Sequence, residues 1–114
     1  MDFQEFKKEL KEYLKVKKLE TFSKNQLFSL ERKYFEWLVQ TEGKCKRCER
    51  TEKLTLDHII PLSLLAQLGI DTEREFYEEN LQLYCQACNH YKGSRLDFII
   101  PKTKELLLKY IEKL

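Results

Sequence analysis

The sequence predicts an α+β fold in which several helices surround one short β-hairpin. Glycine and proline are scarce, at 3 and 2 of 114 residues, while 35% of the residues are charged, and this composition favours helices. Apolar residues recur at helical spacing in three stretches: near the start, after Ser23 and after Pro101. Two short runs of apolar and β-branched residues, 54–60 and 81–84, predict the two strands.

Two helices are expected before residue 43. The first covers residues 2–19, and the second begins at a capping box, in which Ser23 is followed three positions later by Gln26, and ends near Gly43. We interpret both apolar stripes, and the aromatic Tyr91 further along, as core. The stripes consist of Phe3, Phe6, Leu10, Tyr13 and Leu14 in the first helix, and of Leu27, Leu30, Tyr34, Trp37 and Leu38 in the second.

The second half of the chain alternates short elements with one long connection. Residues 62–80 predict a loop with one or two helical turns, because an apolar patch is followed by Gly69 and an acidic run. A short helix is expected from Asn89 to about residue 96. Pro101 then opens a last helix, since proline is favoured in the first helical turn.

Charge and hydropathy exclude several classes of protein. The net charge of +2 is too even to indicate a nucleic-acid partner by itself, although residues 57–82 carry −5 and residues 83–114 carry +3. No stretch approaches the roughly 20 apolar residues of a membrane span, so no membrane partner is expected. The lysine-rich start has no apolar centre and does not resemble a signal peptide, which favours a cytoplasmic location.

Four cysteines form two C-x-x-C pairs, Cys45 with Cys48 and Cys85 with Cys88, separated by 36 residues. A two-residue spacer lets both sulfurs of a pair reach one ion, and two pairs complete a tetrahedral site. Four thiolates suit Zn²⁺ and leave no position open for water, so this zinc would be structural. The alternative is four unrelated buried cysteines. Zinc alone would not define a function.

Between the pairs, Asp57 and His58 are adjacent polar residues inside an apolar strand. Strand alternation sends their side chains to opposite faces of the hairpin, which suits different roles. An aspartate buried in such a strand costs several kcal/mol, on the order of 2–7, unless it is paired or bound to a metal.

The order of these residues resembles the HNH endonucleases, which are ββα-metal nucleases, and in particular their four-cysteine zinc subgroup. The motifs that carry the resemblance are Cys45-x-x-Cys48, Asp57-His58-Ile59-Ile60-Pro61, Asn80-Leu81-Gln82-Leu83-Tyr84-Cys85-x-x-Cys88-Asn89 and Lys92-Gly93. The resemblance spans residues 45 to about 95. It implies a zinc-clamped β-hairpin plus helix, flanked here by N-terminal helices and a C-terminal helix.

The resemblance also implies a catalytic site. His58 matches the general base, while Asp57 and Asn89 match the ligands of a catalytic Mg²⁺ or Mn²⁺ ion, with His90 as the lesser alternative to Asn89. Asn80 matches the asparagine that braces the loop between the strands.

Two basic residues on the expected short helix, Lys92 and Arg95, are predicted to contact DNA phosphates; their alternative is a solvated helix face. Lys92 matches a position of the family, whereas Arg95 is singled out by its charge and by its place three residues further on.

The chain is therefore expected to be one domain, 1–114. It would consist of a helical extension (1–42), an HNH core (43–96) and a C-terminal helix (97–114). Its expected activity is hydrolysis of DNA phosphodiester bonds to leave a 5′ phosphate and a 3′ hydroxyl. Two alternatives remain: a catalytically inactive, zinc-stabilised nucleic-acid-binding module, and a helical interaction protein. The N-terminal helices would serve a homodimer or a larger protein partner, and the DNA substrate could be duplex or branched.

Overall fold

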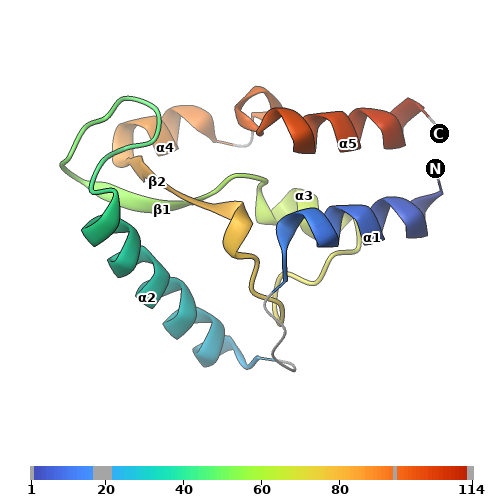
Figure 1. Ribbon diagram of the computed structural model, residues 1–114, viewed down its shortest axis with the longest axis horizontal. Helices are drawn as coiled ribbons and strands as arrows, with labels where there is room; N and C mark the ends of the chain where they lie inside the picture. The colour runs from blue at the N-terminus through green and yellow to red at the C-terminus, as the bar shows by residue number, and fades with distance from the viewer. Residues whose placement is uncertain (1, 17–21, 94, 113–114) are drawn as a thin grey trace.

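The computed structural model describes residues 2–16, 22–93 and 95–112, which form helices around a two-stranded antiparallel sheet (Figure 1). In chain order the elements are α1 (Phe3–Leu14), α2 (Lys24–Thr41), β1 (Leu54–His58), α3 (Leu62–Gln67), the 3₁₀ helix η1 (Glu78–Asn80), β2 (Leu81–Cys85), α4 (Gln86–Lys92), the 3₁₀ helix η2 (Leu96–Phe98) and α5 (Pro101–Glu112). This mixture of helices with one small sheet confirms the predicted α+β class.

Side-chain caps begin the two N-terminal helices. The Asp2 carboxylate accepts a hydrogen bond from the backbone of Glu5, and Ser23 and Gln26 form the predicted capping box at the start of α2. The first helix is shorter than expected, because Lys15 adopts a left-handed conformation (φ 49°) and ends α1. Residues 17–19 of the expected helix lie outside the described residues.

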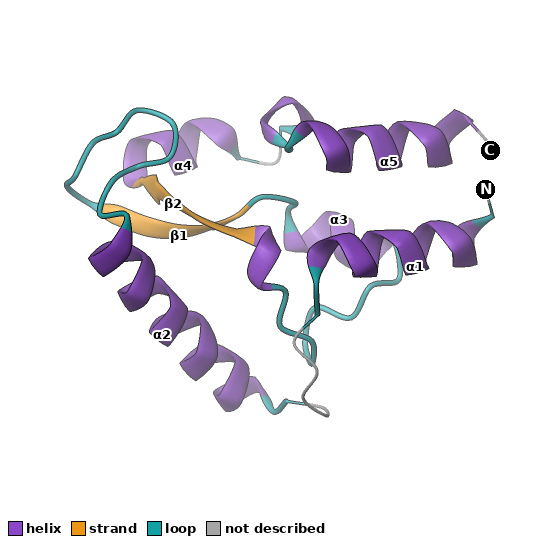
Figure 2. Ribbon diagram, viewed as in Figure 1, coloured by secondary structure: helices purple, strands orange, loops and turns teal. Residues whose placement is uncertain are grey.

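The two strands pair from Leu54 with Cys85 at one end to His58 with Leu81 at the other. Residues 59–80, which include α3 and η1, connect the strands and confirm the expected long loop with helical turns (Figure 2). α4 packs on one side of the hairpin and α2 on the other (Figure 1). Side chains on the two faces of β1 therefore meet different helices.

The main apolar core lies away from the hairpin, where α1 packs beside α5 and α3 (Figure 1). Its buried members are Phe6, Leu10, Leu14, Ile60, Leu65, Ile70, Tyr77, Ile99 and Leu106. The rings of Phe6 and Tyr110 stack within it, with centroids 4.5 Å apart. A second cluster joins Leu27 of α2 to Phe76 and Leu81. The helices at both ends of the chain thus contribute to cores that support the hairpin.

Two aromatic residues expected in the core are exposed. Trp37 is 53% exposed, because α2 contacts the hairpin along one side only and Trp37 stacks instead on Tyr34, 5.7 Å away. Tyr91 is 50% exposed on the outer side of α4.

The short helix after β2 also differs from the prediction. It begins at Gln86 rather than Asn89, because Cys85 acts as its N-cap: the Cys85 sulfur accepts a hydrogen bond from the backbone of Cys88. It ends at Lys92, and Gly93 follows with φ +51°, a conformation that favours glycine. Arg95 therefore lies beyond the helix that was expected to carry it. No helix in the described parts of the chain is long and apolar enough to cross a membrane.

Candidate active site and metal centre

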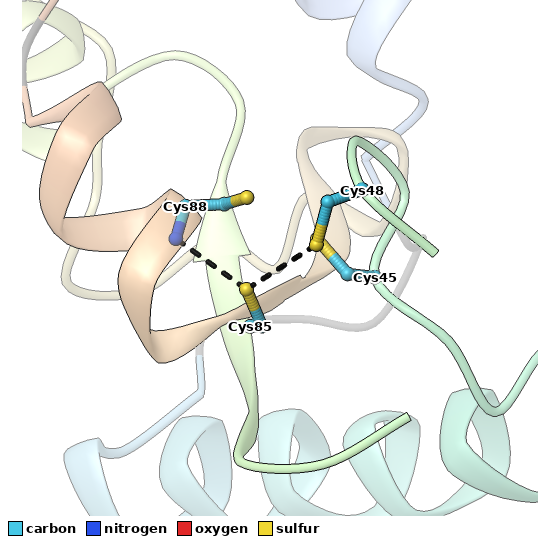
Figure 3. Close-up of side chains that lie close together, drawn as sticks. All are labelled: Cys45, Cys48, Cys85 and Cys88. Carbon is cyan, nitrogen blue, oxygen red and sulfur yellow. Dashed lines mark hydrogen bonds between the residues drawn. The ribbon is translucent and has the colours of Figure 1, made fainter. Parts of the chain in front are cut away.

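The four cysteines meet at one end of the hairpin (Figure 3). Their Sγ atoms all lie within 4.8 Å of one another, and those of Cys48 and Cys85 are 3.6 Å apart. Sulfur ligands about 2.3 Å from a tetrahedral zinc ion lie about 3.8 Å apart, so the cluster fits one such ion. Cys45, Cys85 and Cys88 are buried and Cys48 is exposed. The arrangement supports a structural zinc site and excludes four unrelated cysteines.

One backbone hydrogen bond holds the first cysteine pair against β2, and a second closes the loop that contains the pair. The backbone N–H of Lys46 donates to the Leu83 carbonyl, and that of Cys45 donates to the Arg50 carbonyl, each at 2.8 Å. Burial raises the pKa of the Cys45 thiol, but hydrogen bonds from neighbouring backbone N–H groups outweigh it and lower the pKa to about 6. Cysteine binds a metal in its thiolate form, which a lowered pKa favours.

The Asp57 carboxylate lies between β1 and α4, and it is 5% exposed. Its Oδ2 accepts a hydrogen bond from Nε2 of Gln82, the residue opposite it on β2, at 2.8 Å. Its Oδ1 lies 3.2 Å from Nζ of Lys92, which also donates to the backbone carbonyl of His58 at 2.7 Å. Lys92 is 1% exposed, so a buried ion pair joins α4 to β1 at this point.

Asn89 reaches the same face of β1. Its Nδ2 donates to the hydroxyl of Thr55 at 2.9 Å, and that hydroxyl donates to the Tyr84 carbonyl. Because Thr55 and Asp57 are two residues apart on β1, they share a face of the strand, and Asn89 approaches that face from α4. Asp57, Asn89 and Lys92 are thus gathered between β1 and α4.

His58 faces the other way, toward α2. Its Nε2 lies 3.6 Å from Oε1 of Glu31 and is buried without a hydrogen bond to any described residue. The side chain as a whole is 26% exposed. Residues of the 59–80 connection between the strands, including Phe76 and Tyr77, line the same small hollow as His58 and Glu31. Neighbouring residues of β1 therefore present an acid and an imidazole to different helices.

Asn80 joins the two ends of the 59–80 connection between the strands. It is 1% exposed, its Oδ1 accepts from the Ile60 backbone N–H at 2.7 Å, and its Nδ2 donates to the Ile60 carbonyl at 3.1 Å. The backbone of Asn80 also accepts from Ile59. The Asn80 side chain thus satisfies both backbone polar groups of Ile60, two residues after His58.

Replacing Asn80 by alanine is expected to lower the free energy of unfolding by about 2–4 kcal/mol, because it leaves the Ile60 N–H and carbonyl buried without partners. Urea unfolding of the zinc-loaded protein measures the change. Asn25→Ala, at an exposed position near the start of α2, is the matched control and should have little effect. Equal midpoints for both variants would contradict this role of Asn80.

The remaining predicted or alternative site residues lie nearer the surface. Arg95 is exposed, and its guanidinium carbon lies 4.4 Å from the centre of the Tyr91 ring. His90 is exposed and lines a shallow hollow of about 360 Å³ with Arg50 and Lys53.

Sequence reasoning overlooked two polar neighbours of the Asp57-His58 pair. Gln82 could have been found, because pairing the two predicted strands from the cysteines places it opposite Asp57. Glu31 left no comparable signal, since it appears as one more charged residue on an amphipathic helix.

Comparison with known families agrees with this geometry. The family model of the HNH endonucleases matches residues 45–95, just under half of the chain. No curated protein and no solved structure matches the chain significantly. The match covers both cysteine pairs, the hairpin and α4, while α1, α2 and α5 lie outside it. Residues 45–95 therefore match the HNH endonuclease family, and the four clustered cysteines are consistent with its zinc-binding subgroup.

Proposed function

We propose that this protein is a metal-dependent endonuclease that hydrolyses DNA phosphodiester bonds. The observation that carries the proposal is the Asp57-His58 pair at the end of β1, inside the segment that matches the HNH family. α4 and α2 hold this pair from opposite sides of the hairpin. In this proposal residues 1–114 act as one domain, with the terminal helices supporting the hairpin.

His58 acts as the general base in the proposed reaction. A neutral imidazole can accept a proton from the attacking water, and Nε2 has no hydrogen bond to a described residue that would occupy it. The resulting imidazolium would carry a positive charge, which the Glu31 carboxylate, 3.6 Å away, would offset. The phosphodiester would bind at the end of β1, within reach of both members of the pair.

Asp57 and Asn89 would hold the catalytic Mg²⁺ or Mn²⁺ ion. One carboxylate and one amide supply the oxygen atoms that hard divalent cations prefer, and both side chains approach the same face of β1. The ion would offset negative charge on the phosphate and the departing oxygen. Asp57 already attracts a cation, the Lys92 ammonium, so the carboxylate would have to be shared with Lys92 or released by it.

Lys92 and Arg95 would contact DNA phosphates. The burial of Lys92 means that its ammonium must leave Asp57 to do so, whereas Arg95 is exposed throughout. Metal binding at Asp57 would favour release of the Lys92 ammonium, because two cations at one carboxylate repel each other.

Replacing His58 by alanine should lower the rate at which supercoiled plasmid is nicked by about 10²-fold or more, the usual contribution of a general base. The assay uses zinc-loaded protein with and without added magnesium, because a strong chelator would also remove the structural ion. Glu31→Gln should lower the rate less, since it removes a neighbouring charge and leaves the imidazole.

The chain provides a matched control, because it contains only one other histidine, His90. His90→Ala should nick at the wild-type rate, with zinc content and thermal midpoint unchanged in all variants. Cleavage that survives in His58→Ala would point to a contaminating nuclease. If magnesium produces no cleavage by the wild-type protein, the proposed activity is wrong.

One observation favours a second candidate, an inactive zinc-stabilised nucleic-acid-binding module. The carboxylate that would hold the catalytic ion is paired with Lys92. A permanent pair would keep the fold intact and exclude the metal. Such a protein would bind DNA without cutting it under any divalent cation, and the plasmid assay separates the two candidates.

A further inference from the structure

One exposed surface beside the metal centre combines two arginines with one aromatic ring. The guanidinium carbon of Arg47 lies 4.8 Å from the centre of the Tyr91 ring, and that of Arg95 lies 4.4 Å from it. Arg47 also lies 5.3 Å from the ring centre of Phe98, which contacts Tyr91 edge-on. We call Arg47, Tyr91 and Arg95 the arginine–tyrosine surface.

The three residues come from different parts of the chain. Arg47 lies between the first two cysteines, Tyr91 is on α4, and Arg95 follows the end of that helix. Folding thus brings two like charges to one ring. Two like charges beside one ring repel each other, and an anion bound near them would offset the repulsion.

We propose that the arginine–tyrosine surface binds phosphate groups of the DNA backbone. The inference rests on the proposed function for its substrate class, and it adds Arg47 and Tyr91 to the residues that bind DNA. Tyr91 lies two residues after Asn89 on α4, so the surface is on the same short helix as the candidate catalytic site but on the outer side of that helix.

The state of the two arginines supports a ligand-binding role over a purely structural one. Both are exposed, and neither forms an ion pair with a carboxylate within residues 2–16, 22–93 and 95–112. Stacking on Tyr91 orders their long side chains in advance, which lowers the entropy lost when a phosphate binds. Planar guanidinium groups also match phosphate oxygens with two parallel hydrogen bonds.

Arg47 has one structural contact that must be separated from the proposed role. Its Nη1 lies 3.6 Å from the Cys88 sulfur, so Arg47 also offsets charge at the metal centre. Arg95 has no contact with the cysteines among the described interactions, and its stacking partner is Tyr91. Arg95 and Tyr91 therefore provide the cleaner tests, with zinc content measured for every variant.

The test measures binding of a fluorescent DNA duplex to zinc-loaded protein without magnesium, at several salt concentrations. Arg95→Gln should weaken binding and reduce the slope of log affinity against log salt by about 0.9, because one phosphate contact is lost. Arg47→Gln should have the same effect. Tyr91→Leu should weaken binding about two- to five-fold with the slope retained, while Tyr91→Phe should bind like the wild type.

Arg32→Gln is the matched control, because Arg32 is an exposed arginine on α2, across the hairpin from α4. It should change neither the affinity nor the slope. If Arg95→Gln and Tyr91→Leu bind like this control, or if the wild-type protein binds no DNA, the inference is wrong. Because binding is measured without magnesium, its outcome does not depend on cleavage. A protein that binds DNA through this surface but does not nick plasmid when magnesium is added would overturn the proposed function and leave this inference in place.

Discussion

Removal of the metal from the four-cysteine site is expected to abolish the cooperative thermal unfolding transition of the protein. The sulfurs join the segment before β1 to the end of β2, and Cys85 also caps α4. Metal binding contributes about 10–16 kcal/mol in small zinc-folded peptides, which is as large as the whole stability of an ordinary domain, about 5–15 kcal/mol. Loss of the ion should therefore separate β1, which carries Asp57 and His58, from β2.

Cys85→Ser tests this expectation without a chelator. Zinc content and circular dichroism during heating should show loss of the ion together with loss of the transition. Gln86→Ala is the matched control, because Gln86 is the next residue and its side chain is exposed. An unchanged thermal midpoint in zinc-free Cys85→Ser would show that the apolar core of α1, α3 and α5 maintains the fold unaided.

Replacing Lys92 by methionine is expected to destabilise the protein by about 3–5 kcal/mol. The substitution removes one partner of a buried ion pair and leaves the Asp57 carboxylate, 5% exposed, without its counter-charge. The double variant Asp57→Asn with Lys92→Met should recover most of this loss, because no buried charge then remains. Urea unfolding measures both effects. Lys8→Met, at an exposed position on α1, is the control.

The same variants test whether Lys92 and a divalent cation compete for Asp57. Magnesium or manganese should raise the thermal midpoint of Lys92→Met more than that of the wild-type protein, because the vacated carboxylate is free to bind metal. The double variant should show no such rise. Equal shifts in the wild-type protein and in Lys92→Met would mean that the lysine does not oppose metal binding.

Much of the fold was accessible from local signals. The capping box at Ser23, the periodic stripes and the proline at residue 101 each marked a helix that the structure contains. The two cysteine pairs also indicated which strands meet, because four ligands of one ion bring residues 45–48 and 85–88 together.

The features that could not be predicted from the sequence depend on contacts between elements far apart in the chain. α4 begins earlier than expected because a cysteine sulfur, an unusual cap, accepts its first hydrogen bond. The burial of Lys92 runs against the general exposure of lysine, although its position three residues after Asn89 places both on one side of the helix. The contact of Glu31 with His58 arises only when α2 packs on the hairpin.

The two ends of the hairpin have a joint consequence for strand alignment. The cysteine cluster fixes the end at Cys85, and the Asn80–Ile60 hydrogen bonds fix the end near His58. A slip of β1 by one residue along β2 would exchange the faces of Asp57 and His58. The Asp57 carboxylate would then point toward Glu31, and the His58 imidazole would point toward Lys92. The anchors at both ends therefore add stability and also prevent an alternative strand alignment, in which Asp57 and His58 would lose their contacts with Lys92 and Glu31.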